Sequence, residues 1–518
     1  MTFEIVFVLL SLLGMVAALI ADKMRPGMIL FSVVVLFLCA GILTPKEMLE
    51  GFSNKGMITV ALLFLVSEGI RQSGTLGQVI KKLLPQGKTT VFKAQLRILP
   101  SVAFISAFLN NTPVVVIFAP IIKHWAKSVN LPATKFLIPL SYVTILGGIC
   151  TLIGTSTNLV VHGMILEAGF EGFSMFELGK VGIFIAIAGI IYIFLFSKRL
   201  LPDARPDTAV PDEEVEEGEK LHRVEAVLGA RFPGINKKLK DFNFQRHYGA
   251  EVKEIKTRNG QRFVSNLEEV VLHEGDTLVV MADDTFIPTW GESSVFVLLT
   301  NGNEPDTTGK KKKRWFALLL LVLMIVGATV GELPITKEMF PDIKLDMFFF
   351  VSITTIIMAW TNLFPARKYT KYISWDILIT IACAFAISKA MVNSGVADGV
   401  ASYIIGLSHN YGPHVLLAIL FIITNLFTEL ITNNAAAALA FPLALAISQQ
   451  LGVDPTPFFV VICMAASASF STPIGYQTNL IVQGIGNYKF TDFVRIGLPL
   501  NIITFLISVF LIPLIWPF

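Results

Sequence analysis

Charged side chains and catalytic motifs are both scarce in this chain of 518 residues. Only 15% of the residues are Asp, Glu, Lys or Arg, 54% are hydrophobic, and the mean hydropathy is +0.68, which excludes an ordinary soluble domain. We find no P-loop, Ser/His/Asp set or metal-ligand cluster, so we expect neither an enzyme nor an organic cofactor. The net charge of +3 gives no basis for binding nucleic acid. The four cysteines, Cys39, Cys150, Cys383 and Cys463, lack paired or metal-ligand spacing, and we interpret them as core residues.

Long apolar runs dominate the rest of the sequence. A membrane-spanning helix needs about 20 residues to cross about 30 Å of hydrocarbon, and runs of 15 to 18 residues recur along the chain. Examples are Phe3 to Ile20, Met28 to Leu43, Val181 to Phe196, Phe316 to Val330 and Ile502 to Trp516. The first run has no basic segment before it and no cleavage site, so we interpret it as a retained span. The sequence predicts an all-α polytopic membrane protein.

One polar interval divides the apolar sequence into two halves, 1–199 and 315–518. Residues 200–314 contain acidic and basic linkers around a core at about 222–290. Segments of this core alternate in strand fashion around an expected hairpin turn at Asn259 and Gly260, and residues 235–249 have the pattern of an amphipathic helix. The interval therefore predicts a small α+β insert.

The two apolar halves repeat each other. "FLNNTPVVVIFAP" resembles "LITNNAAAALAFP", which pairs Asn111 with Asn433, and "GTSTNLVVHG" resembles "GYQTNLIVQG", which pairs Asn158 with Asn479. The offset stays near 320 residues, and chance matches between apolar segments would not maintain it.

Basic residues predict the orientation of the spans. Clusters of Lys and Arg flank many of the apolar runs, and such clusters favour the cytoplasmic side. Threading spans between them gives five crossings and one re-entrant segment per half. An odd number of crossings makes the repeats inverted, and it places the insert in the cytoplasm and both termini outside. Inverted repeats are typical of secondary transporters, whose binding sites form from broken helices near the midplane.

Each half contains one expected re-entrant hairpin, at about 98–123 and at about 411–449. Three adjacent polar residues stand at each turn: Asn110, Asn111 and Thr112 in the first, and Thr432, Asn433 and Asn434 in the second. Pro113 suits the first turn of a new helix, which Asn111 or Thr112 would cap. Such residues at bilayer depth need a partner or a cavity.

Each half also contains one expected broken helix, at about 134–169 and at about 456–486. The loops "GTSTN" and "GYQTN" interrupt them, and we expect the second segments to begin near Leu159 and Leu480. Irregular backbone at this depth is tolerated only where it is buried or lines a site. Helix N-termini suit an anion, and carbonyl, amide and hydroxyl oxygens suit Na⁺. These residue types also pack helices together in membranes, but their recurrence at matched offsets favours a binding site.

These motifs resemble the divalent anion:sodium symporter family of the ion-transporter superfamily. The central Asn of each hairpin tip and the last Asn of each loop are kept, whereas the paired prolines of the family's loops are not. The sequence is most similar to the branch of sodium/sulfate symporters that carries a cytoplasmic insert. Residues 224–282 resemble one TrkA-C (RCK C-terminal) domain, which implies a possible small regulatory ligand there.

The resemblance implies a homodimer in a cell inner (plasma) membrane whose transport unit moves as an elevator. It assigns one Na⁺ site to Asn111, Gly154, Thr155 and Asn158, and a second to Asn433, Pro473, Gly475 and Asn479. It assigns anion contacts to Asn110, Thr112, Ser156, Thr157, Thr432, Asn434, Gln477 and Thr478.

The expected function is Na⁺-coupled import of a small divalent oxyanion, with sulfate first and a dicarboxylate second. A cation/proton antiporter of the same superfamily is the alternative, although the two loops contain no acidic residue. A potassium channel would need four pore loops around one axis, and this chain offers two repeats. Glu68 and Lys389 stand at equivalent positions and either pair with each other or extend to the membrane interface. Glu429 is expected to support the second hairpin by hydrogen bonds.

Overall fold

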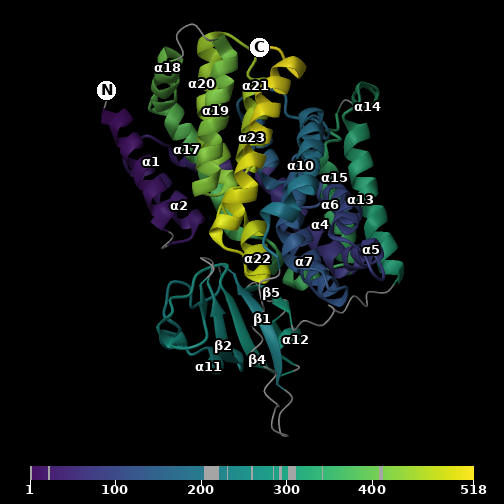
Figure 1. Cartoon of the computed structure of the whole chain (residues 1–518). Helices are drawn as coiled ribbons and strands as arrows, with labels where there is room; N and C mark the ends of the chain where they lie inside the picture. The colour runs from purple at the N-terminus through teal and green to yellow at the C-terminus, as the bar shows by residue number, and fades with distance from the viewer. Residues whose placement is uncertain are drawn as a thin grey trace.

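The computed structural model describes residues 3–21, 24–203, 221–229, 231–257, 261–283, 285–290, 295–300, 311–340, 342–407 and 412–518. Long helices run side by side in one part of the molecule, and a small sheet lies at one end of them (Figure 1). By length and composition, eight of the described helices can cross a membrane. The protein is an all-α polytopic membrane protein with a small α+β insert, as the sequence predicts.

The first half contains ten α-helices within the described residues. They are α1 (Phe3–Ala21), α2 (Pro26–Cys39), α3 (Pro45–Glu50), α4 (Lys55–Gln72), α5 (Thr75–Leu83), α6 (Val91–Ser106), α7 (Asn111–Ser128), α8 (Leu137–Gly148), α9 (Ser156–Glu167) and α10 (Gly179–Leu200).

The second half begins after the insert and contains eleven described α-helices. They are α13 (Lys311–Gly331), α14 (Pro334–Met339), α15 (Met347–Trp360), α16 (Tyr369–Tyr372), α17 (Trp375–Asn393), α18 (Val396–Leu407), α19 (Gly412–Leu430), α20 (Asn433–Leu451), α21 (Thr456–Ser467), α22 (Gln477–Gly486) and α23 (Phe490–Ile515).

Burial separates central helices from peripheral ones. Every residue of α8 is buried, and so is every residue of α21 after Thr456. The outer helices instead expose large apolar side chains, such as Phe104 of α6, Phe184 of α10 and Phe510 of α23. Apolar exposure on this scale fits a lipid-facing surface. The two central helices have 12 residues each, or about 18 Å, and end inside the protein.

The insert is a five-stranded antiparallel sheet with its own apolar core. Its strand order is β3-β2-β4-β1-β5, from β1 (His222–Leu228), β2 (Glu251–Lys256), β3 (Arg262–Phe263), β4 (Thr277–Ala282) and β5 (Phe296–Thr300). The last strand, β5, lies beyond the expected core at 222–290 and pairs with β1. The expected turn at Asn259 and Gly260 lies outside the described residues.

The amphipathic helix expected at 235–249 is wrong. This segment holds a 3-10 turn at Leu239–Asp241 and one helical turn, α11 (Phe244–Tyr248), and another short helix, α12 (Phe286–Trp290), precedes β5. Asn243 caps α11, and Gly249 ends it in the left-handed conformation (φ +70°), so the helix cannot extend. The apolar side chains of this segment pack into the aromatic core of the insert instead.

One contact between the insert and the helices is ionic. Lys123 of α7 donates a hydrogen bond to Glu225 Oε2 of β1 at 2.9 Å, and Lys256 of β2 donates to Glu225 Oε1 at 3.3 Å. Burial by itself raises the pKa of Glu225, but the two ammonium groups outweigh that effect and lower this pKa to about 2. The carboxylate therefore stays ionised between its two partners.

Two further contacts join the insert to the second half. Gly275 lies against Leu480 of α22, since a Cβ atom at Gly275 would stand 3.1 Å from Leu480 Cδ2. Arg231 Nη2 donates to the carbonyl of Ile373, just before α17, at 3.2 Å. The insert thus contacts α7 and α22, which come from different halves of the chain.

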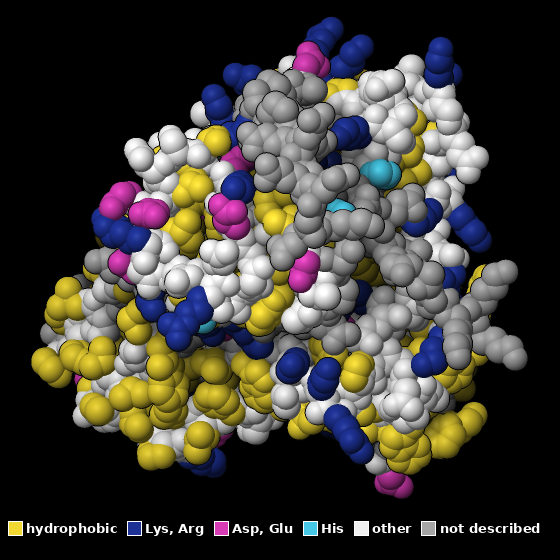
Figure 2. Space-filling view, turned by 90° about the horizontal axis from the view of Figure 1, so that it is seen from below, with side chains coloured by type: hydrophobic (Ala, Val, Ile, Leu, Met, Phe, Trp, Pro, Cys, Tyr) yellow, Lys and Arg dark blue, Asp and Glu magenta, His cyan; other side chains and the backbone are white. Residues whose placement is uncertain are grey.

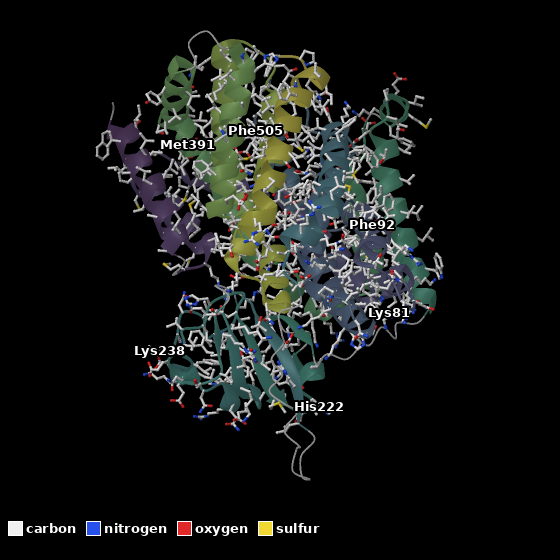
Figure 3. All side chains as sticks on the ribbon, viewed as in Figure 1. Lys81, Phe92, His222, Lys238, Met391 and Phe505 are labelled. Carbon is white, nitrogen blue, oxygen red and sulfur yellow. The ribbon has the colours of Figure 1, made fainter. Side chains whose placement is uncertain are left out.

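The figures show how side-chain character changes toward the insert. Met391, Phe92 and Phe505 lie among the long helices, whereas His222 and Lys238 lie on the insert (Figure 3). Seen from the insert's end, Lys and Arg side chains are spread over the face of the molecule (Figure 2). Lys81 of α5 lies near this end of the helices (Figure 3).

Glu68 forms its ion pair within its own helix, α4, and not with Lys389. Both oxygens of its carboxylate accept hydrogen bonds from Arg71 at 2.7 Å, and Gln72 donates to it at 2.6 Å. Lys389 is exposed on α17. The pair Glu68–Lys389 is therefore not formed, because an arginine one turn away already neutralises the carboxylate.

Candidate functional site

Both hairpins turn at the expected tips. α6 ends at Ser106 and α7 begins at Asn111, while α19 ends at Leu430 and α20 begins at Asn433. The expected cap of α7 is wrong by one residue, since Asn110 is its N-cap and makes no side-chain capping bond. Thr432 caps α20 by accepting a hydrogen bond from the Ala435 N–H at 3.4 Å.

Both broken helices are interrupted where the sequence indicates, but their second segments begin three residues early. α9 begins at Ser156 rather than near Leu159, and α22 begins at Gln477 rather than near Leu480. The polar residues of "STN" and "QTN" therefore form the first turns of these helices instead of the loops. Four helices, α7, α9, α20 and α22, thus begin at polar residues.

Asn111 and Asn433 occupy the same environment in the two hairpins. Ser106 Oγ donates to Asn111 Oδ1 at 2.8 Å, and Thr428 Oγ1 donates to Asn433 Oδ1 at 2.9 Å, in each case from five residues earlier. Asn111 is fully buried and Asn433 nearly so. In each hairpin a hydroxyl from the first helix fixes the amide that begins the second.

Asn158 and Asn479 hold the two loops by equivalent bonds. Asn158 Nδ2 donates to the Thr151 carbonyl at 2.8 Å, and Asn479 Nδ2 donates to the Thr472 carbonyl at 3.1 Å. Their oxygens differ: Asn479 Oδ1 accepts from Ser141 Oγ at 2.7 Å, whereas Asn158 Oδ1 is buried without a hydrogen-bond partner in the described part of the chain. A buried, unpaired acceptor beside a loop suits a cation.

The loop threonines fasten each broken helix to its neighbouring hairpin. Thr151 Oγ1 donates to the Ala107 carbonyl and accepts from the Gly154 N–H, and Thr472 Oγ1 donates to the Glu429 carbonyl at 3.2 Å and accepts from the Gly475 N–H. Pro473 is buried within the second loop. Each loop and its hairpin therefore form one unit.

Glycine lets these units approach closely. A Cβ atom at Gly148 would lie 2.7 Å from Asn111 Oδ1 and 3.1 Å from the Gly154 carbonyl oxygen. At Gly475, a Cβ atom would lie 1.9 Å from Ser469 Oγ. Oxygen atoms of the hairpin and the loop converge here only because no side chain stands between them.

The anion candidates bond reciprocally between the repeats. Ser156 Oγ and Thr157 Oγ1 of α9 donate to Asn434 Oδ1 of α20 at 3.2 Å and 3.5 Å. Thr112 Oγ1 of α7 donates to Gln477 Oε1 of α22 at 3.3 Å. Thr112 is equivalent to Asn434 and Ser156 to Gln477, so each contact mirrors the other, as a two-fold relationship requires.

Exposure divides the candidates into a deep and a shallow set. Asn111, Asn158 and Asn479 are fully buried, whereas Asn110, Thr112, Ser156 and Gln477 are partly or fully exposed. A recess beside the first tip is lined by Asn110, Ser156 and Ser67 together with apolar residues of α4. Thr478 does not line this recess, and its hydroxyl oxygen lies 2.9 Å from Ser141 Oγ of α8.

Sequence reasoning missed Tyr476. This residue is the N-cap of α22, is buried, and stands in its loop where Thr155 stands in the other. Asn111 Nδ2 donates to its hydroxyl at 2.6 Å, and Thr155 Oγ1 lies 3.0 Å from the same oxygen. A large polar aromatic residue inside an otherwise small-residue loop was the available signal.

Glu429 was expected to support the second hairpin, and it binds the adjoining loop. Its Oε1 accepts from the Ser471 N–H at 2.9 Å and from Asn501 Nδ2 at 2.7 Å. Its Oε2 is buried without a partner among the described residues, and so is Asn501 Oδ1. The carboxylate joins α19, the second loop and α23.

The set of donor atoms fits Na⁺ better than a transition metal. The tips and loops offer amide, hydroxyl and backbone oxygens, which suit a hard cation. Within the described residues, no group of three His, Cys, Asp or Glu side chains is placed to hold a metal ion.

Comparison with known families shows to which family the chain belongs. Residues 16–445 and 339–518 match the family described as "Citrate transporter". The chain belongs to the citrate transporter family. Members of this family and the relatives below are transporters, not enzymes, and the resemblance to the ion-transporter superfamily is confirmed.

Curated relatives match more than half of this chain. An uncharacterised transporter of Synechocystis is 30% identical over 93% of this chain and 92% of its own length. Sodium/sulfate cotransporter 1 of Chlamydomonas reinhardtii is 33% identical over 55% of this chain and 32% of its own length. The YdaH transporter of Alcanivorax borkumensis, whose crystal structure has an unusual topology, has a TM-score of 0.52 at 11% identity over 100% of this chain and 99% of its own, a likeness of fold alone.

Proposed function

We propose that this protein is a Na⁺-coupled importer of a small divalent oxyanion, with sulfate as the leading substrate. The observation that carries the proposal is the meeting of four helix N-termini, those of α7, α9, α20 and α22, through Thr112–Gln477 and Ser156–Asn434. Helix N-termini carry partial positive charge and free N–H groups, which bind anions without a buried cationic side chain. The names of the sodium/sulfate cotransporters among the relatives support sulfate and Na⁺.

The two Na⁺ sites are proposed at the deep residues. Site 1 takes Asn111, the loop Gly154 and Thr155, and Asn158, whose Oδ1 lacks a partner among the described residues. Site 2 takes Asn433, Pro473, Gly475 and Asn479, of which Asn433, Gly475 and Asn479 are equivalent to Asn111, Gly154 and Asn158. Bound Na⁺ supplies positive charge beneath the anion, so that the empty site carries no permanent charge of its own.

The anion site is proposed on the more accessible side of these residues. Asn110, Thr112, Ser156, Thr157, Asn434 and Gln477 supply amide and hydroxyl groups, and Thr432 and Thr478 hold the helix ends that carry them. A sulfate ion offers only acceptors at neutral pH, so hydroxyls and amide N–H groups are its matching partners.

The transport cycle is proposed as an elevator in a homodimer of the plasma membrane. Each hairpin is tied to its broken helix by loop threonines, which favours movement of these elements as one unit. The Lys and Arg side chains on the face that carries the insert favour the cytoplasm for that face (Figure 2).

A regulatory role is proposed for the insert, which contacts the mobile unit directly. Lys123 of α7 binds Glu225, Leu480 of α22 packs on Gly275, and Arg231 binds the backbone before α17. A small ligand on the insert would bias the cycle by changing these contacts. Removal of residues 222–300 with a short linker in their place is expected to alter the uptake rate; unchanged uptake by intact dimers would reject regulation.

Coupling to protons, or exchange of a cation for protons, is the second candidate. One observation favours it: Glu429 Oε2 is buried next to the second hairpin without a partner among the described residues. The substrate alternative is a dicarboxylate such as succinate, which offers the same acceptor chemistry as sulfate.

Radiolabelled sulfate uptake into proteoliposomes tests the proposal. Uptake is expected to require an inward Na⁺ gradient and to be lost in Asn111→Ala and in Asn433→Ala. Gln449→Ala, which removes an exposed amide near the C-terminal end of α20, is the matched control and should transport normally. Uptake of succinate instead of sulfate would reassign the substrate, and uptake of neither would favour the antiporter.

A further inference from the structure

Tyr476 belongs to the loop of the second proposed Na⁺ site, and its side chain reaches the first site. Its hydroxyl oxygen lies 2.6 Å from Asn111 Nδ2 and 3.0 Å from Thr155 Oγ1, both of site 1, while its chain neighbour Gly475 belongs to site 2. Its backbone caps α22, so the residue is fixed to the second repeat while its side chain enters the first.

We propose that Tyr476 is a positioning residue that couples the two cation sites through its hydroxyl. This proposal rests on the proposed function. Tyr476 contributes no ligand oxygen to either Na⁺ in the proposal; it sets the orientation of the Asn111 amide, which does.

The chemistry of a phenol explains the coupling. The hydroxyl has one proton to donate and can accept hydrogen bonds at the same oxygen. It accepts from Asn111, and its own proton is left for Thr155. A cation that fixes Asn111 and Thr155 at site 1 thereby fixes the Tyr476 ring and, through its backbone, the neighbouring Gly475, and so orders site 2 before its own ion arrives.

The surroundings leave the hydroxyl few other choices. Tyr476 is 9% exposed, and Asn111 Oδ1 is held by the Ser106 hydroxyl of its own hairpin. Because that bond fixes one end of the Asn111 amide, a change at the Tyr476 oxygen rotates the other end. A threonine at this position, as in the first loop, would be too short to reach the opposite hairpin.

The test measures Na⁺ binding without transport. The unfolding temperature of the purified full-length protein is followed against NaCl concentration, with choline chloride keeping the ionic strength constant. We expect a cooperative rise for the wild type, with a Hill coefficient above one. In Tyr476→Phe the Hill coefficient should fall to about one. The Na⁺ concentration at half-saturation should rise by at least about fivefold, which is the lower end of typical coupling between two sites.

Two variants complete the design. Thr155→Val removes one partner of the hydroxyl and should shift the curve in the same direction. Tyr192→Phe is the control, because Tyr192 is also buried and its hydroxyl donates to the Ile496 carbonyl at 3.1 Å, away from the hairpins; its curve should match the wild type.

The outcomes separate the coupling from the function on which it rests. One outcome is that Tyr476→Phe lowers the unfolding temperature equally at every Na⁺ concentration and leaves the Hill coefficient and the half-saturating Na⁺ concentration unchanged. That result would overturn the coupling alone. The absence of any Na⁺ response in the wild type would overturn the Na⁺-coupled function and the coupling with it.

Discussion

Thr155 and Tyr476 stand at the same position in the two loops, and their hydroxyl oxygens lie 3.0 Å apart. Equivalent residues of two related units can touch only where the axis between the units passes. The axis that relates the repeats therefore runs through the proposed site. Residues proposed to bind ligand in the two repeats are thereby brought close to one another.

Gly148→Ala should reduce Na⁺ affinity. The new methyl group would lie 2.7 Å from Asn111 Oδ1, and relieving such a clash costs about 1–3 kcal/mol, or about fivefold to 150-fold in affinity. The measurement is the Na⁺ dependence of sulfate uptake. Gly399→Ala in α18 is the control, because no atom lies within 4 Å of its added Cβ; equal losses in both variants would contradict this account of the site.

Gln477→Ala and Thr112→Val should weaken the binding of the anion more than the binding of Na⁺. Each removes one polar group from the reciprocal pair at the first turns of α7 and α22, and one hydrogen bond contributes about 1 kcal/mol, or about fivefold. The KM for sulfate should therefore rise by about that factor at saturating Na⁺, with little change in the Na⁺ dependence. Thr504→Val, whose hydroxyl donates to the Leu500 carbonyl of the same helix, α23, should leave the KM unchanged.

Glu429→Gln should transport nearly as well as the wild type, whereas Glu429→Ala should not. Glutamine keeps an oxygen for the Ser471 N–H, and alanine leaves that partly buried N–H without this acceptor, which costs about 1 kcal/mol. Uptake against external pH distinguishes this structural role from proton carriage. A Glu429→Gln variant that binds sulfate but has lost the pH dependence of wild-type uptake would establish the proton-coupled alternative.

Glu225→Gln should loosen the insert from α7. Removing one member of a mostly buried ion cluster costs on the order of 3 kcal/mol, which lowers the unfolding temperature at pH 7. The pKa of Glu225 is about 2, below its ordinary 4.5, so its contribution is complete above pH 4.5 and is lost as the pH falls toward 2. Between pH 5 and pH 3 the wild type should therefore lose stability more steeply than the variant; parallel curves would show that Glu225 is not the group involved.

The repeats made much of the site predictable, because a constant offset identifies equivalent residues whatever the fold. It indicated the hairpin tips and the loops, and the structure gives Asn111 and Asn433 matching partners. The predicted starts of α9 and α22 were too late, because Ser, Thr and Gln occur in loops as readily as in the first turn of a helix. The N–H groups of a first turn have no partner within the helix, so these residues can begin a helix as well as precede one.

Contacts between distant segments could not be predicted. The bond between Asn111 and Tyr476 joins residues 365 apart, and no local pattern encodes it. The ionic contact of Lys123 with Glu225 crosses from a membrane helix to a strand, and each residue alone is an ordinary charged position. Strand β5 was missed because "VFVLLT" is a short apolar run that pairs only once β1 is in place.

The position of Tyr476 near the end of the chain constrains biosynthesis. The ribosome completes the first hairpin and the first loop hundreds of residues before the residue that satisfies Asn111 and Thr155 is made. During that interval these polar side chains must be hydrated or held by other groups, because an unpaired amide in hydrocarbon is costly. Chains truncated before residue 476 should therefore be recognised by membrane quality control, and the two repeats should mature together rather than in sequence.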